Sequence, residues 1–274
     1  MGVFDFLKRK KITIDEFYEL GKLYSDKGEY RKSIDYFSKA LEIWRKQCQI
    51  QLNQDEKYSN LNELKKATSS LADIINQGDK IAFALYGRAI AYFLIKDYRN
   101  AILDYTEVLK FCPPQEEKVE IYYERGNIYM EIKDFIAAIK DYSEAIKLDT
   151  KNIKAYLGRS QAYLYLSYDF ISNVTNEKIN KLSKNLGIYS DREMMKIIRD
   201  DCNVVLSIEN KNNEALFRRG TANMHLGYLD KALTDFEKID VNTLPEVKNF
   251  INEIRQQMTY RQMGYDGNGD KVWI

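Results

Sequence analysis

The chain repeats one arrangement of large and small residues, and this repetition limits its possible folds more than any other feature. Before Tyr92, a large residue is followed four positions later by a small one, and the tyrosine comes three positions after that. The same spacing recurs at Tyr24, Tyr129 and Tyr163, whereas a fifth copy has Asn223 in place of tyrosine. Spacings of three, four and seven residues place side chains on one face of an α-helix, so each copy predicts a helix.

A second set of positions follows each of these helices. Twelve residues after the small position stands another small residue in most copies, and a bulky ring such as Phe37 or Tyr142 comes four residues later. The sequence therefore predicts units of helix, turn and helix, in which small residues on the first helix leave room for a ring from the second. The turns are expected at residues 28–30, 96–98, 133–135 and 227–229.

These residues resemble the tetratricopeptide repeat, a helical hairpin with a 34-residue period. Tyr129 and Tyr163 are one period apart. The resemblance implies an all-α fold, a right-handed superhelix (α-solenoid) of about five repeats whose concave face usually binds proteins or peptides. We expect repeats at about 14–47, 82–115, 119–152, 153–212 and 213–244, within a domain spanning 13–244. A leader (1–12), a capping helix (245–262) and a tail (263–274) complete the expected organisation.

Residues 48–81 span one period without a good copy of the repeat. A helical hairpin is one interpretation: the second helix of the first repeat continues to about Leu52, and another helix returns from about Glu56. The alternative is a decayed sixth repeat. The hairpin is favoured, because a single extra helix would reverse the chain direction before the next repeat.

A second interruption, residues 169–194, separates the two helices of the fourth repeat. Ser190 and Glu193 have the spacing of a capping box, which predicts that the second helix begins directly after Ser190. A short helix within residues 178–185 is expected to end at Gly187. A segment of this length is either a tolerated surface loop or a binding element, and the loop is the favoured interpretation.

Composition and motifs exclude several classes of function. The chain has 42 Lys+Arg against 41 Asp+Glu, without the basic excess that is typical of nucleic-acid binders, so we expect no nucleic-acid partner. Its single histidine excludes any mechanism or metal site that needs two. The three cysteines lack metal-ligand spacing, and the sequence contains no catalytic or phosphate-binding motif. We therefore expect no enzyme, no catalytic residues, no cofactor and no metal.

The first residues are not arranged as a secretory signal. Phe4, Phe6 and Leu7 precede the basic cluster at residues 8–11, which is the reverse of the secretory order. We therefore expect a cytoplasmic location. A weak contact of residues 4–11 with an acidic membrane is the less favoured alternative to a frayed leader or the packing start of the first helix.

The first helices of this family line the concave face, so residues between the packing positions are expected there. Aromatic side chains with a few polar groups suit peptide anchoring. We expect a non-enzymatic interaction scaffold of the adaptor or assembly-factor type, with Asn127 and Arg218 holding polar groups of the ligand. The alternative is a peptide-sensing regulator without its own DNA-binding domain. The expected groove residues are Phe83, Tyr86, Ile90, Phe93, Tyr123, Asn127, Met130, Leu157, Gln161, Leu164, Tyr165, Phe217, Arg218 and Met224.

Some members of this family hold the tails of Hsp70 or Hsp90 with a carboxylate clamp. The clamp takes Lys and Asn from one first helix, Asn from the next, and Lys with Arg from the third. One register of this chain gives Tyr123 and Asn127, then Gly158, then Glu214 and Arg218. No register completes the set, so the expected partner is a protein or peptide held by other means.

Overall fold

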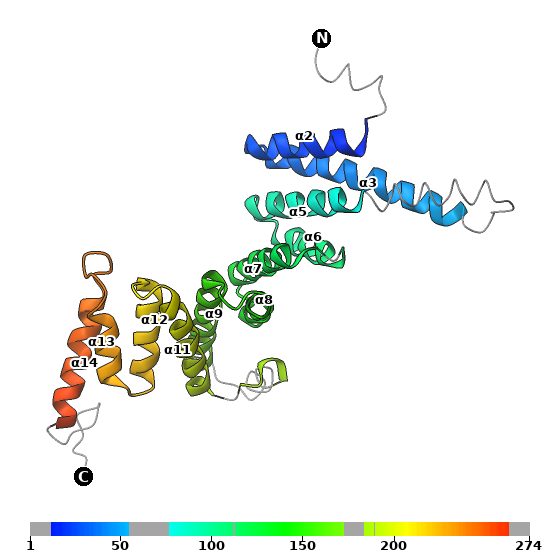
Figure 1. Ribbon diagram of the computed structural model, residues 1–274. Helices are drawn as coiled ribbons and strands as arrows, with labels where there is room; N and C mark the ends of the chain where they lie inside the picture. The colour runs from blue at the N-terminus through cyan, green and yellow to red at the C-terminus, as the bar shows by residue number, and fades with distance from the viewer. Residues whose placement is uncertain (1–11, 55–76, 112, 173–183, 189, 263–274) are drawn as a thin grey trace. The chain divides into compact units, whose positions relative to one another are not determined.

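The computed structural model describes residues 12–54, 77–111, 113–172, 184–188 and 190–262 (Figure 1). The regular secondary structure of these residues is helical, which confirms the all-α class predicted from the sequence. The chain divides into two compact units, Met1–Ile121 and Tyr122–Ile274.

The first unit is built from helical hairpins. Helix α2 packs on α3, α5 packs on α6, and α3 lies against α5. Helix α3 continues past Trp44, and the expected return of the long hairpin falls on residues 55–76, outside the described part of the chain. The helices are α2 (Ile14–Asp26), α3 (Tyr30–Gln54), α5 (Gly78–Leu94), α6 (Tyr98–Lys110) and the start of α7 (Gln115–Glu131).

The second unit begins within α7 and continues the pattern of paired helices. Consecutive helices from α8 to α14 pack against each other, with α9 on α11, α12 on α13 and α13 on α14. Helix α9 extends to Ser172, within the expected insert, and residues 173–183 lie outside the described part of the chain. The helices are α8 (Phe135–Leu148), α9 (Ile153–Ser172), α11 (Asp191–Ile208), α12 (Asn213–His225), α13 (Leu229–Phe236) and α14 (Val247–Gln262).

One backbone conformation recurs at four hairpin turns. Gly28, Lys96, Lys133 and Gly227 have φ values of 73°, 63°, 60° and 85°, in the left-handed region. The residue after each donates its N–H to the carbonyl five residues earlier, at 2.8 or 2.9 Å, as in a Schellman motif. In every case the next helix begins two residues after the left-handed residue, so the four predicted turns are confirmed.

Side-chain caps fix where several helices begin. The hydroxyl of Thr13 accepts from the Glu16 N–H while the Glu16 carboxylate accepts from the Thr13 N–H, a complete capping box before α2. Before α11 the Ser190 hydroxyl accepts from the Glu193 N–H at 3.3 Å. The predicted start of α11 after Ser190 is therefore confirmed.

Rings from second helices pack directly against glycines of first helices. A Cβ atom on Gly126 would lie 2.8 Å from the Tyr142 ring, and one on Gly158 would lie 2.6 Å from the same ring. Gly220 has the same relationship to Phe236, at 2.8 Å. The small residues predicted from the sequence thus mark the positions where two helices and a ring meet.

Candidate functional site

The α5 residues expected to contact a ligand are partly exposed. Phe83 exposes 46% of its surface, whereas Ile90 and Phe93 are half-buried. The ring of Tyr86 packs edge-on against Tyr105 of α6, with centroids 5.7 Å apart and planes at 78°. The Phe83 ring is therefore accessible to a ligand, and the Tyr86 ring is held in place by Tyr105.

A groove with a volume of about 330 Å³ lies beside Phe83 and Tyr86. It is bounded by α5, α6 and the first two turns of α7, so all of it belongs to the first unit. Its floor is apolar, and three exposed glutamates of α7 stand along its rim. Such a surface suits an apolar anchor with positively charged flanks. The remaining lining residues are Ala82, Val108, Glu116, Glu117, Glu120 and Ile121.

The expected binding residues of α7 in the second unit pack closely around Tyr142. The ring of Tyr123 lies 5.9 Å from that of Tyr142, and the Lys154 ammonium lies 5.8 Å from the Tyr123 ring. The Tyr142 hydroxyl donates to Asn127 Oδ1 at 2.8 Å, and burial raises the pKa of this tyrosine. The Asn127 amide is therefore used within the core, while Met130 is half-buried beside it on α7.

The expected residues of α9 differ widely in exposure. Leu164 is buried, whereas Tyr165 exposes 46% of its surface and lies 5.5 Å from the ring of Phe135. Leu157 and Gln161 are half-buried. Tyr165 is thus the most exposed of the four α9 residues expected in the groove.

Arg218 was expected to face a ligand, but the structure buries it, with 6% of its surface exposed. Its guanidinium donates to the Leu157 carbonyl at 2.7 Å, to Ser160 Oγ at 3.1 Å and to Gln161 Oε1 at 2.5 Å. It also pairs with the carboxylate of Glu214, and burial lowers its pKa. Arg218 joins α9 to α12 and is not available to an external carboxylate or amide.

Arg218 is buried because large and small side chains have exchanged places between two neighbouring helices. Arg218 occupies the position that is Gly158 one repeat earlier, and Cys202 occupies the ring position of Tyr142. A small thiol leaves space that a ring would fill, and the arginine takes it. Burial raises the pKa of the Cys202 thiol to about 12.

The last expected residues lie beside the C-terminal helix. The ring of Phe217 is 5.8 Å from Phe236 and 5.6 Å from Phe250 of α14. Met224 is half-buried on the same helix as Phe217. Phe217 is therefore covered by α14 and contributes to packing.

Sequence reasoning missed a set of ion pairs that ties the hairpins together. In four repeats, an arginine one residue before the small position of the first helix makes two hydrogen bonds to one aspartate of the second helix. The signal was present, because both residue types recur at fixed positions. The pairs are Arg88–Asp104, Arg125–Asp141, Arg159–Asp201 and Arg219–Asp235.

The second helix of the preceding repeat is also reached by Arg88, Arg159 and Arg219. Arg88 donates to Ser38 at 2.9 Å, Arg159 to Ser143 at 3.0 Å, and Arg219 to an asparagine of α11 at 2.8 Å. Each of these arginines therefore links three helices.

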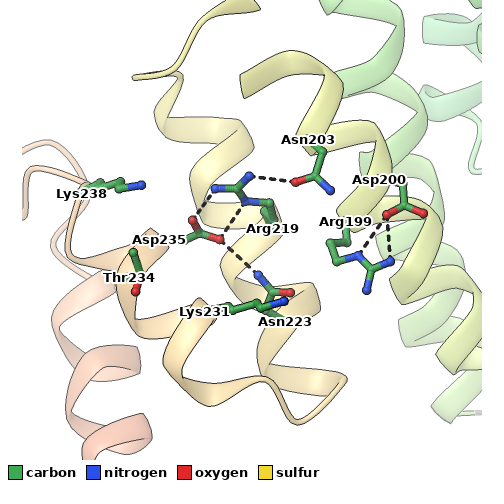
Figure 2. Close-up of a pocket in the computed structure, with 9 residues that line it drawn as sticks. All are labelled: Arg199, Asp200, Asn203, Arg219, Asn223, Lys231, Thr234, Asp235 and Lys238. Atoms are coloured by element: carbon green, nitrogen blue, oxygen red, sulfur yellow. Dashed lines mark hydrogen bonds and ion pairs between the residues drawn. The ribbon is translucent and has the colours of Figure 1, made fainter. Parts of the chain in front are cut away.

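A second, polar hollow lies between α11, α12 and α13 in the second unit (Figure 2). Its volume is about 550 Å³. The Arg219–Asp235 pair lies in its lining, and Asn223 donates to Asp235 at 3.3 Å. None of the groove residues expected from the sequence lines it. The lining residues are Arg199, Asp200, Asn203, Arg219, Asn223, Lys231, Thr234, Asp235 and Lys238.

The described part of the chain holds neither a metal-binding cluster nor a helix that could span a membrane. Among those residues, no group of three or more His, Cys, Asp or Glu side chains is placed to hold a metal ion. No helix there combines the length and apolar character needed to cross a membrane.

Sequence models of the tetratricopeptide repeat match residues 17–46 and 119–152. Both ranges fall on hairpins described above, α2–α3 and α7–α8. This chain therefore contains tetratricopeptide repeats. In the α7–α8 and α12–α13 hairpins, the packing of a ring on a glycine occurs together with an arginine–aspartate pair.

Two solved structures share the fold. The crystal structure of YrrB, a TPR protein with an unusual peptide-binding site, has a TM-score of 0.55 at 14% identity, covering 90% of this chain and 94% of that one. The crystal structure of MamA has a TM-score of 0.54 at 16% identity, covering 86% and 94%. At these identities the likeness shows the fold alone.

A curated relative matches over a short segment. Peptidyl-prolyl cis-trans isomerase FKBP42 of Arabidopsis thaliana is 46% identical over 54 residues, which are 20% of this chain and 14% of that protein. The match thus spans about one-seventh of the relative. The tetratricopeptide repeat is typically a non-enzymatic module for protein interaction, and its stacked hairpins give this chain the form of such a scaffold.

Proposed function

We propose that this chain is a non-enzymatic scaffold of the adaptor or assembly-factor type, which binds a peptide or protein segment through an aromatic-lined groove. The main support for this proposal is the open groove beside Phe83 and Tyr86. Phe83 is a large apolar side chain exposed over nearly half its surface. Because its ring is not buried, the protein does not gain the free energy that burial of an apolar ring provides. A ligand that covers the ring would recover that free energy.

The charge of the groove indicates the kind of segment that it accepts. Glu116, Glu117 and Glu120 are exposed at its edge, and no basic residue is among those that line it. A ligand rich in carboxylates would be repelled there, whereas Lys or Arg beside an apolar anchor would be attracted. The preferred ligand is therefore an apolar or aromatic anchor with basic neighbours, rather than an acidic chain terminus.

The test uses the fluorescein-labelled peptide Ac-Lys-Leu-Lys-Trp-Leu-Lys-NH2 and fluorescence anisotropy. Phe83→Ala combined with Tyr86→Ala should weaken its binding about 30-fold, which corresponds to about 2 kcal/mol and is the scale of interface hot spots. Far-UV circular dichroism and the thermal midpoint should show that the double variant remains folded.

The control is Leu103→Ala, because Leu103 is 57% exposed on α6 but does not line the groove. It should leave the affinity unchanged. A peptide with Glu in place of every Lys should bind at least tenfold more weakly. Equal affinity of the folded double variant and the unchanged protein would place the binding surface elsewhere.

A further inference from the structure

The polar hollow of Figure 2 lies where most repeats of this chain carry a tyrosine. Tyr92, Tyr129 and Tyr163 occupy the corresponding position of their first helices, and Asn223 replaces them in the fifth repeat. The ring of Tyr92 lies 5.7 Å from the guanidinium carbon of Arg88, the arginine of its own ion pair. The missing ring in the fifth repeat leaves the space beside the equivalent pair, Arg219–Asp235, open.

Asn223 does not satisfy its own hydrogen-bonding groups in that space. Its side chain is 3% exposed, and its Nδ2 donates to Asp235 Oδ2 at 3.3 Å. Its Oδ1 is buried without a hydrogen-bond partner. Rotating the amide would direct its oxygen at the Asp235 carboxylate, so the hollow retains a buried acceptor that requires a donor.

The charged groups around this acceptor favour an anionic ligand. Arg219 is paired with Asp235, and Arg199 is paired with Asp200. Lys231 and Lys238 make no ion pair with the described residues, although the Lys231 ammonium lies 5.3 Å from the Tyr228 ring. Two positive charges thus remain uncompensated along the α13 side of the hollow.

We propose that this hollow binds a tyrosine side chain from a partner protein, carried on a segment with acidic residues on both sides. The phenol ring takes the place beside Arg219 that the chain's own tyrosines take in earlier repeats. Its hydroxyl donates to Asn223 Oδ1, and the flanking carboxylates pair with Lys231 and Lys238. This site shares no residue with the groove at Phe83, so either site can exist without the other.

The probe is the fluorescein-labelled peptide Ac-Glu-Asp-Tyr-Glu-Asp-NH2, measured by fluorescence anisotropy in low salt. It should bind the unchanged protein, and the version with Phe in place of Tyr should bind at least fivefold more weakly because it lacks the donor. Asn223→Tyr fills the hollow with the residue found in the other repeats. This variant should reduce the affinity at least tenfold without lowering the thermal midpoint.

A second variant keeps the test informative if Asn223→Tyr does not fold. Lys231→Glu with Lys238→Glu changes exposed side chains only and should reduce the affinity at least tenfold, whereas Lys211→Glu, at an exposed residue outside the hollow, should reduce it less than twofold. Equal binding of the Tyr and Phe peptides, or unchanged binding by folded Asn223→Tyr, would overturn the proposal. If ending the chain at Gln262 raises the affinity tenfold, the chain's own residues 263–274 are the occupant and a partner segment is not.

Discussion

Tyr142 of α8 is in direct contact with Gly158 of α9, where a Cβ atom would lie 2.6 Å from Cζ of the ring. Tyr142 is 1% exposed and also lies against Gly126 of α7. One ring thus fixes the spacing of three helices. The contact explains why a small residue is required on both sides of the ring position.

Gly158→Leu should destabilise the second unit, because the added side chain has to displace a buried ring. The expected loss is roughly 1–3 kcal/mol of the free energy of unfolding, the usual cost of overpacking. Gly126→Leu should behave similarly. Urea denaturation followed by circular dichroism measures both. Ser207→Leu, at an exposed position of α11, is the control and should change stability by less than about 0.5 kcal/mol.

Cys202 and Arg218 reverse the sizes of Tyr142 and Gly158, and this reversal should appear as energetic coupling. Cys202→Tyr introduces a ring where the Arg218 guanidinium lies, and Arg218→Gly leaves a cavity beside Ser160. Each single change should be destabilising. The double variant restores the arrangement of the preceding repeat. Its loss of unfolding free energy should be at least 1 kcal/mol smaller than the sum of the two single losses, within the usual range of such couplings. Additive losses would show that the two positions are independent.

The ion pair of Arg88 and Asp104 should contribute far more than surface pairs do. Their side chains are 13% and 8% exposed, so Asp104→Ala leaves a buried guanidinium without its partner and should cost about 3–5 kcal/mol. Glu144→Ala removes an exposed pair with Lys147 and should cost less than about 1 kcal/mol. Chemical denaturation compares the two. Similar losses would show that solvent screens the buried pair as strongly as the exposed one.

The first repeat of the chain suggests a rescue for this pair. It has Leu20 and Tyr36 at the two positions, and Tyr36 stacks on Tyr24 with centroids 5.1 Å apart. Arg88→Leu with Asp104→Tyr should therefore recover part of the stability lost in Asp104→Ala. If the double variant loses more stability than Asp104→Ala, the hydrogen bond from Arg88 to Ser38 is essential for the stability of this hairpin.

The helices and turns could be predicted from the sequence because they depend on local spacing. The ring of Tyr142 and the small residue Gly126 lie one helix apart in the same hairpin, and their spacing along the chain is fixed. The burial of Arg218 could not be predicted in the same way. It depends on the size of Cys202 and on acceptors at Leu157 and Gln161, which belong to another repeat.

The candidate site likewise combines features that local spacing predicts with features that depend on other helices. The sequence indicated that Phe83 and Tyr86 share a helix face, and the structure places both beside a groove. The acidic rim comes from the first turns of α7, which the helix pattern of α5 does not specify. The polar hollow depends on one departure from the pattern, Asn223, whose consequence required the positions of Arg219 and Asp235.

Stability should fall at alkaline pH because buried thiol and phenol groups resist ionisation. Burial raises the pKa of Cys202 from 9.0 and that of Tyr163 from 10.0, in both cases to about 12. The unfolded chain ionises at the lower values, so the stabilisation is complete below about pH 9 and is lost as the pH rises towards about 12. The raised pKa of Tyr163 alone should lower the free energy of unfolding by roughly 1 kcal/mol by pH 11. Tyr163→Phe should flatten the pH dependence of the free energy of unfolding, and an identical slope in this variant would contradict the assignment.

The insert of the fourth repeat should divide into a replaceable part and an anchored part. The sequence favoured a tolerated surface loop for residues 169–194, but Ile188 is only 3% exposed, and Lys140 of α8 donates to Asn185 at 2.8 Å. A Gly/Ser linker in place of residues 173–183 should therefore preserve helicity and cooperative melting. Ile188→Ala should cost about 2–5 kcal/mol, as is usual for a buried isoleucine. Ile208→Ala, at a position 46% exposed near the end of α11, should cost less than about 1 kcal/mol. Equal effects of the two alanine variants would show that Ile188 does not anchor the insert, and loss of folding with the linker would make residues 173–183 structural.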